Sequence, residues 1–190
     1  IGKQSKRDRL LARQSEWIDL IYANHSGVQN NGKNIFVFDG ASPVYHDGKK
    51  VFQAPGFTDW VFQIDETIAN GEWEIEKIAS ALITGFRDFM KSIWQKKVVI
   101  GLSGGIDSAV VATLAVLAIG RENVIAVSMP SEYNSDTTKW LASDLASELG
   151  IDYRIIPIQE SVDFTREQIE SVFQVSTEWL IAENIQARDR

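Results

Sequence analysis

Apolar and polar positions follow a helical period at the start of the chain and a shorter, strand-like pattern after it. Segment 4–18 places leucines and a tryptophan three and four residues apart beside a row of basic residues, which predicts an amphipathic surface helix. The Asp47-Gly48 pair, between two runs of β-branched and aromatic residues, predicts a tight hairpin turn. Strands are expected within 19–27, 34–46, 49–57 and 59–65.

Strand and helix patterns alternate in the second part of the chain. Apolar spacing predicts a long helix over 73–94, and Ser135, Gly120 and Gly150 stand where helices are expected to begin or end. The expected order is then strand 98–102, helix 108–119, strand 123–131, helix 136–149, strand 152–158 and helix 161–173. Such alternation predicts an α/β fold, a Rossmann-like parallel sheet with right-handed crossovers and helices on both faces.

The polar stretch "ETIANGE" separates these two patterns and predicts a linker. We therefore expect a first domain over 1–66, a linker over 67–72 and a second domain over 73–190.

Composition and charge exclude several classes of function. The chain holds no cysteine, so disulfides, thiolate metal sites and thiol nucleophiles are excluded within it. A net charge of −7 argues against a broad nucleic-acid surface, and the longest apolar run, 109–119, is too short to cross a bilayer. The charged first residues do not fit a secretory signal, so we expect a cytoplasmic protein without membrane or nucleic-acid partners.

The stretch "VVIGLSGGIDSAVV" places a small-residue turn between a strand and a helix, at the edge of the sheet where ligands bind in such folds. Gly104 and Gly105 are expected to take positive φ and to bring their N–H groups close to an anion, and the helix starting near Ser108 adds its positive end. Ser103 and Ser108 can donate hydroxyls to a phosphate, and Asp107 can hold a Mg²⁺ that the phosphates share. The alternative is a structural turn in which Asp107 or Ser108 is only a helix N-cap.

The letters "SGGIDS" resemble the S-G-G-x-D-S signature of the ATP pyrophosphatases, also known as adenine nucleotide alpha-hydrolase-like proteins. This resemblance implies that the turn grips the pyrophosphate of ATP, with Asp107 as the metal ligand and Asp107 and Ser103 as catalytic residues. The residues implied to bind ATP or pyrophosphate are Gly101, Leu102, Ser103, Gly104, Gly105, Ile106, Asp107 and Ser108.

Two further segments resemble NAD synthetases. "MPSEYNSDTTKWLASDLASELGI" is similar to their second strand, loop and helix, although Glu132 stands where many relatives carry Arg or Gln. "TEWLIAENIQARDR" is similar to their E-N-x-Q-A-R segment, which implies that Asn184 and Arg188 contact deamido-NAD.

Residues 2–42 resemble the closing third of a nitrilase-like glutaminase, an α+β sandwich, including its F-D-G-x-S strand end. A glutaminase tail before an SGGxDS core is the order found in glutamine-dependent NAD synthetases. The resemblance implies a piece of a homo-oligomeric ligase that uses ATP, Mg²⁺ and glutamine-derived ammonia, with the rest of both domains, including a Glu-Lys-Cys triad upstream of Ile1, outside this chain. The alternatives are another SGGxDS enzyme such as GMP synthetase, or a nucleotide-binding module without catalysis.

Overall fold

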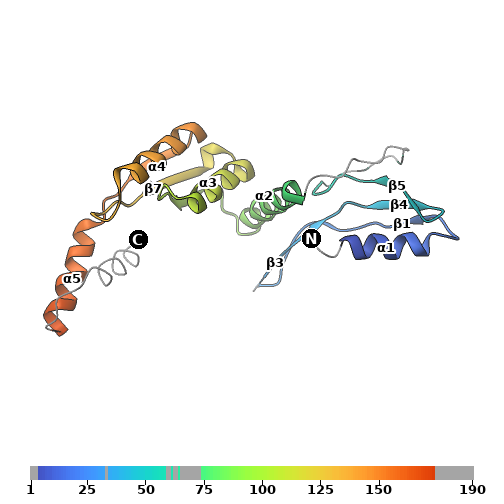
Figure 1. Cartoon of the computed structure of the whole chain (residues 1–190), viewed down its shortest axis with the longest axis horizontal. Coiled ribbons are helices and arrows are strands. Elements are labelled where there is room, and N and C mark those ends of the chain that lie inside the picture. The colour runs from blue at the N-terminus through green and yellow to red at the C-terminus, as the bar shows by residue number, and fades with distance from the viewer. Residues whose placement is uncertain (1–3, 33, 59–60, 62–63, 65–73, 174–190) are drawn as a thin grey trace. The chain divides into compact units, whose positions relative to one another are not determined.

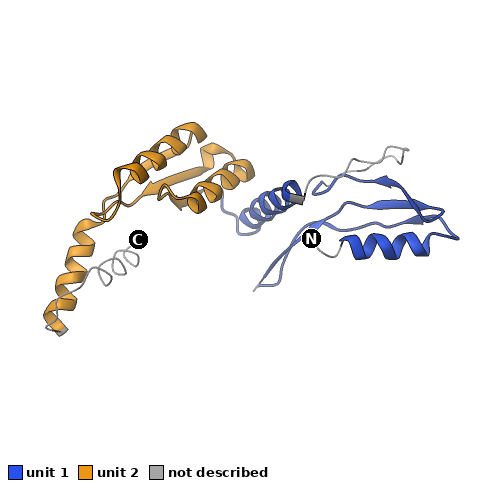
Figure 2. Cartoon of the chain, viewed as in Figure 1, with its two compact units in different colours: residues 1–95 blue, residues 96–190 orange. Residues whose placement is uncertain are grey.

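The computed structural model describes residues 4–32, 34–58, 61, 64 and 74–173, and the chain forms two compact units, residues 1–95 and 96–190 (Figures 1 and 2). The predicted strand 59–65 and the predicted linker 67–72 lie almost entirely outside the described residues. The domain division at 66–73 therefore stays a prediction.

The first unit is built from short antiparallel strands and two helices. One sheet has the strand order β1-β4-β5 and the other pairs β2 with β3. Its elements are α1 (Gln4–Gln14), β1 (Leu20–Ile21), β2 (Ser26–Asn30), β3 (Ile35–Asp39), β4 (Pro43–His46), β5 (Lys49–Gln53) and α2 (Glu74–Ser92). The predicted hairpin turn is confirmed, since Asp47 and Gly48 have φ of 46° and 72° between β4 and β5.

The first helix is shorter than the sequence predicts. It ends at Gln14, and the Ser15 carbonyl accepts a hydrogen bond of 3.1 Å from the Gly48 N–H of the hairpin turn. Trp17 and Ile18, placed on the helix by their spacing, are 89% and 61% exposed. The chain therefore makes a tertiary hydrogen bond at the position where apolar spacing predicted a further turn of helix.

Helix α2 packs on the hairpin formed by β2 and β3, and a glycine permits the close approach. A Cβ added at Gly85 would lie 2.9 Å from Cγ2 of Val37 in β3, which is shorter than a normal van der Waals contact. Glycine lowers helix stability relative to alanine, so its place here is explained by packing.

The second unit is a three-stranded parallel sheet with the order β6-β7-β8. Its elements are β6 (Val98–Gly101), α3 (Ile106–Ile119), the 3-10 helix η1 (Arg121–Asn123), β7 (Val124–Ser128), α4 (Asp136–Leu149), β8 (Asp152–Ile155) and α5 (Gln159–Phe173). The predicted α/β fold with a parallel sheet is confirmed. Helix α4 has the predicted bounds, with Ser135 as its N-cap and Gly150, at φ 65°, as its C-cap.

Small side chains hold α3 and α4 close to the sheet and to each other. The buried residues of the two helices are all alanines, namely Ala112, Ala115, Ala118, Ala142 and Ala146. They face alternate residues of β7, of which Val124 and Ala126 are 1% and 0% exposed. The predicted cover on the second face of the sheet is not found in the described part of the chain, where Val99 is 65% exposed.

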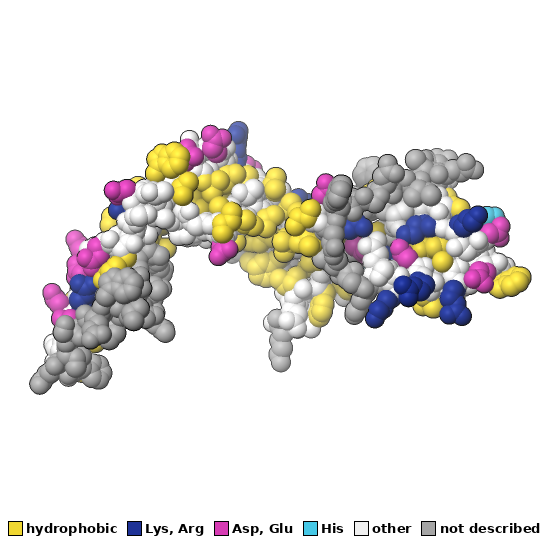
Figure 3. All heavy atoms as spheres, in the orientation of Figure 1, with side chains coloured by type: hydrophobic (Ala, Val, Ile, Leu, Met, Phe, Trp, Pro, Cys, Tyr) yellow, Lys and Arg dark blue, Asp and Glu magenta, His cyan; other side chains and the backbone are white. Residues whose placement is uncertain are grey.

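Helix α3 is apolar nearly all the way round, as its sequence "IDSAVVATLAVLAI" shows. Val110, Val111 and Leu117 are 48%, 53% and 58% exposed, and Figure 3 shows apolar side chains gathered over this part of the second unit. No helix among the described residues is both long and apolar enough to span a bilayer.

The contact between Gly85 and Val37 predicts the outcome of a double-mutant cycle. Gly85→Ala alone should destabilise α2, because the steric cost of about 1 to 3 kcal/mol exceeds the gain of about 1 kcal/mol in helix propensity. In a Val37→Ala background the same substitution should stabilise α2 by about 0.5 to 1 kcal/mol. Hydrogen exchange of the α2 amides measures both effects. Equal effects of Gly85→Ala in the two backgrounds would contradict the packing described here.

Candidate functional site

The turn between β6 and α3 lies at the carboxyl end of the parallel sheet, where this fold places its ligands. The backbone stays in register with β7 up to Leu102, whose N–H donates to the Val127 carbonyl at 2.8 Å. The Leu102 side chain is 1% exposed and belongs to the core, while Gly101 and Ser103 lie at the surface. The predicted contact of Leu102 with ATP stays a prediction, and its buried side chain is explained by packing.

The two glycines of the turn differ in conformation. Gly104 has a φ of 82°, as predicted. The prediction for Gly105 is wrong: its φ is −87°, which any residue can adopt. A Cβ added at Gly105 would meet nothing nearer than Ser103 Oγ at 3.4 Å.

Gly104 also touches the first turn of α4. A Cβ added at Gly104 would overlap the carbonyl oxygen of Thr138 and lie 2.8 Å from its carbonyl carbon. The positive φ and this backbone contact are two independent reasons for glycine here.

Hydrogen bonds between two serines close the turn. Ser103 and Ser108 have their hydroxyl oxygens 3.2 Å apart, and the Ser103 N–H donates to Ser108 Oγ at 3.3 Å. Ser108 Oγ donates to the Gly105 carbonyl at 2.9 Å, and the Gly105 N–H donates to Ser103 Oγ at 3.3 Å. The two predicted phosphate-binding hydroxyls are thus brought together on the same side of the turn.

Helix α3 begins at Ile106, two residues earlier than predicted, and its N-cap is Gly105, which makes no side-chain cap. Asp107 and Ser108 lie inside the first turn, so the alternative that one of them is the N-cap is wrong. The first amides of a helix have no partner within the helix and carry its positive end. Backbone donors at Ile106 and Asp107 are therefore suited to bind an anion.

Asp107 has an exposed side chain in this first turn. Within the described ranges, no group of three or more His, Cys, Asp or Glu side chains is arranged to hold a metal by itself. A single carboxylate fits Mg²⁺, which takes one or two protein carboxylates and completes its shell with phosphate oxygens and water.

The loop after β7 lies at the same end of the sheet and is fixed by polar contacts. The Ser131 N–H donates to Asn134 Oδ1 at 3.0 Å, and the Glu132 N–H donates to Gln159 Oε1 at 2.8 Å. Arg166 of α5 donates to the Glu132 carboxylate at 3.0 Å, and this hydrogen bond lowers the pKa of Glu132. Glu132, a departure from the resembling families, is thus paired with Arg166.

The structure describes one of the three remaining predicted site residues. Asn184 and Arg188, predicted to bind deamido-NAD, lie outside the described residues. Ile106 of the predicted set is 76% exposed at the start of α3.

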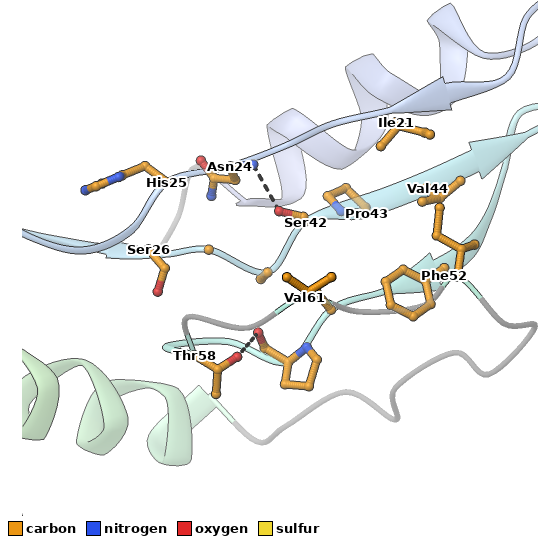
Figure 4. Close-up of a pocket in the computed structure, with 15 residues that line it drawn as sticks. Ile21, Asn24, His25, Ser26, Ser42, Pro43, Val44, Phe52, Thr58 and Val61 are labelled. Carbon is orange, nitrogen blue, oxygen red and sulfur yellow. Dashed lines mark hydrogen bonds between the residues drawn. The ribbon is translucent and has the colours of Figure 1, made fainter.

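A pocket that the sequence did not indicate lies in the first unit (Figure 4). It has a volume of about 1030 Å³, and His25 is the titratable side chain among its mostly apolar lining. The Asn24 N–H donates to Ser42 Oγ at 3.0 Å and Thr58 Oγ1 donates to the Pro55 carbonyl at 3.2 Å, so these polar groups already have partners. The pocket shows no arrangement of reactive groups among the residues that are described.

Comparison with known proteins identifies the family to which the chain belongs. The model of the NAD synthase family matches residues 78–190. A glutamine-dependent NAD(+) synthetase from Synechocystis is 34% identical over all of this chain, and one from Aquifex aeolicus is 46% identical over 62% of it. The chain spans 36% and 21% of these two relatives, so it corresponds to about a third or less of their length.

Solved structures give the same relationship. The glutamine-dependent NAD+ synthetase from Acinetobacter baumannii, in complex with ADP, has a TM-score of 0.90 at 30% identity, covering 100% of this chain and 38% of that one. The match to an NH3-dependent NAD synthetase from Campylobacter jejuni (TM-score 0.54, 34% identity) covers 61% of this chain and 48% of that protein's chain. The match to an NMN synthetase from Francisella tularensis (TM-score 0.52, 32% identity) covers 62% of this chain and 47% of that protein's chain.

The two glycines of the turn predict opposite responses to alanine. Gly104→Ala should destabilise the second unit by about 2 to 4 kcal/mol, because alanine is strained at positive φ and its Cβ would meet Thr138. Gly105→Ala should change stability by less than about 1 kcal/mol, since alanine's weaker N-cap preference is offset by the smaller entropy of the unfolded chain. Denaturant unfolding of the two variants checks this, and equal losses would show that the turn has another conformation.

Proposed function

Because the chain belongs to the NAD synthase family, we propose that it forms part of a ligase that uses ATP to convert deamido-NAD into NAD. The chain spans about a third of its relatives, so the proposal concerns the longer protein of which the second unit carries the ATP-binding turn. The observation that carries the proposal is the pairing of Ser103 and Ser108 around the uncapped start of α3.

The turn suits the leaving group of an adenylation reaction. The carboxylate of deamido-NAD would attack the α-phosphorus of ATP, forming an acyl adenylate and breaking the bond to pyrophosphate. Backbone amides at Ile106 and Asp107, with the hydroxyls of Ser103 and Ser108, would bind the pyrophosphate oxygens as their charge grows. The backbone amides among these donors are held by the fold, so they stabilise the transition state without having to reorganise.

Asp107 would hold Mg²⁺ beside the same oxygens, and the ion would supply positive charge to the departing phosphates. Asp107 lies in the first turn of α3, on the same stretch of chain as the first amides of the helix. Asp107 is therefore proposed as the metal ligand of the site, and Ser103 as a donor to the reacting phosphates.

Ammonia would then attack the acyl carbon, lose a proton and release AMP, leaving the amide of NAD. We assign the supply of ammonia to glutamine hydrolysis in a nitrilase-like domain that includes the first unit, because the relatives are glutamine-dependent synthetases. Residues 1–190 contain no cysteine, so a thiol nucleophile for that hydrolysis would be supplied by another part of the longer protein. Asn184 and Arg188 remain the proposed contacts to deamido-NAD. A homo-oligomer in the cytoplasm, and domain bounds at 1–66, 67–72 and 73–190, complete the proposal.

Exchange of labelled pyrophosphate into ATP tests the adenylation step in the whole longer protein. With deamido-NAD present, Asp107→Asn should lower the exchange rate by about two orders of magnitude or more, because it removes the charge that holds the metal. Asp144→Asn, an exposed aspartate in the middle of α4, provides the matched control and should keep the wild-type rate. Undiminished exchange in Asp107→Asn would reject the metal assignment.

The same assay separates two substrate classes. The similarity to an NMN synthetase makes nicotinate mononucleotide the natural comparison for deamido-NAD. Exchange that depends on deamido-NAD and not on the mononucleotide is the result expected for a synthetase that makes the dinucleotide.

A further inference from the structure

We infer that Ser135, the residue before α4, is a positioning residue for the pyrophosphate-binding turn, an inference that rests on the function proposed above. Ser135 lies 27 residues or more after the SGGIDS turn, and the sequence assigned it only the start of a helix. Its role follows from two contacts that the structure connects.

The first contact joins the turn to α4. Gly104 lies so close to Thr138 that a Cβ there would meet the carbonyl oxygen, carbonyl carbon and Cα of Thr138. The wall behind the turn is therefore backbone, which has no side-chain rotamer by which to move aside. The position of the Thr138 peptide sets the position of Gly104.

The second contact fixes Thr138 in place. Ser135 Oγ accepts from the Thr138 N–H at 3.2 Å and lies 3.2 Å from Thr138 Oγ1. Thr138 Oγ1 in turn donates to the Ser135 carbonyl at 2.8 Å. Ser135 and Thr138 thus hold each other from both sides, and the first turn of α4 is closed by this pair.

The other side-chain contact described in this helical turn is weaker. Asp136 and Lys139 are 3.5 Å apart, with side chains 103% and 43% exposed, and an ion pair so open to water contributes little. The cap at Ser135 is therefore the stronger of these side-chain interactions, and we assign it the role of keeping the Thr138 peptide against Gly104.

Loss of the cap should weaken the affinity for the anion at a point where the protein is still folded. Amides that converge on a phosphate lose affinity when the backbone carrying them shifts, and a displacement of about 1 Å in such a site has large effects. A fraying first turn of α4 would leave Gly104 free to shift, and the amides at Ile106 and Asp107 would move with it.

Calorimetric titration of the longer protein with magnesium pyrophosphate tests the inference. Ser135→Ala should weaken binding about five- to tenfold, the size expected when an N-cap is lost. Ser135→Thr keeps the hydroxyl and should bind within about twofold of the wild type. Hydrogen exchange should show a less protected Thr138 amide in Ser135→Ala alone.

Gly150→Ala is the matched control, because it weakens the opposite end of α4 at a residue with a φ of 65°. It should lower the melting temperature as Ser135→Ala does and leave pyrophosphate binding unchanged. Wild-type affinity in Ser135→Ala, or an equal loss in Gly150→Ala, would overturn the inference.

Two further outcomes are informative. If the unsubstituted protein binds no pyrophosphate, the proposed function fails, and the positioning role fails with it. If Ser135→Ala does not fold, Thr138→Val removes both contacts of the Thr138 hydroxyl, with the Ser135 carbonyl and with Ser135 Oγ, and unchanged binding in that variant would overturn the inference in the same way.

Discussion

The contact of Gly104 with the Thr138 backbone is the constraint on which the candidate site depends. It joins the turn after the first strand of the sheet to the helix after the second, so that two consecutive strand-turn-helix segments share one surface. The serine hydroxyls and the uncapped amides of α3 are placed by this contact rather than by their own loop alone. A side chain at Gly104 would separate the two segments.

Local chemistry explains which parts of the fold were predictable. The bounds of α4 follow from Ser135 and Gly150, because a helix cap depends on a few neighbouring atoms. The start of α3 was misplaced by two residues because Gly105 caps it without a side chain, so the sequence offers no hydroxyl or carboxylate to mark the position. The close approach of Gly104 to Thr138, 34 residues away in the sequence, is a tertiary contact that no local pattern contains.

Helix α2 shows the same limit at the level of domains. The NAD synthase family model begins at residue 78, inside this helix, whereas its packing surface is the β2–β3 hairpin of the first unit. Apolar spacing predicted the helix well but not the hairpin on which it packs, because an amphipathic pattern indicates that one face is buried and does not identify the element that buries it. The contact of Gly85 with Val37 identifies the partner. Most of α2 therefore belongs to the NAD synthase match in sequence, although the helix packs in the first unit.

The apolar surface of α3 has a practical consequence for work in solution. Val110, Val111 and Leu117 present valine and leucine to water on a helix that carries charge only at Asp107. Residues 1–190 handled in isolation should self-associate through this surface, since contiguous exposed apolar area promotes aggregation. Dilution is then a direct way to keep such chains apart, because the contact between them is apolar and is not an ion pair that salt would screen.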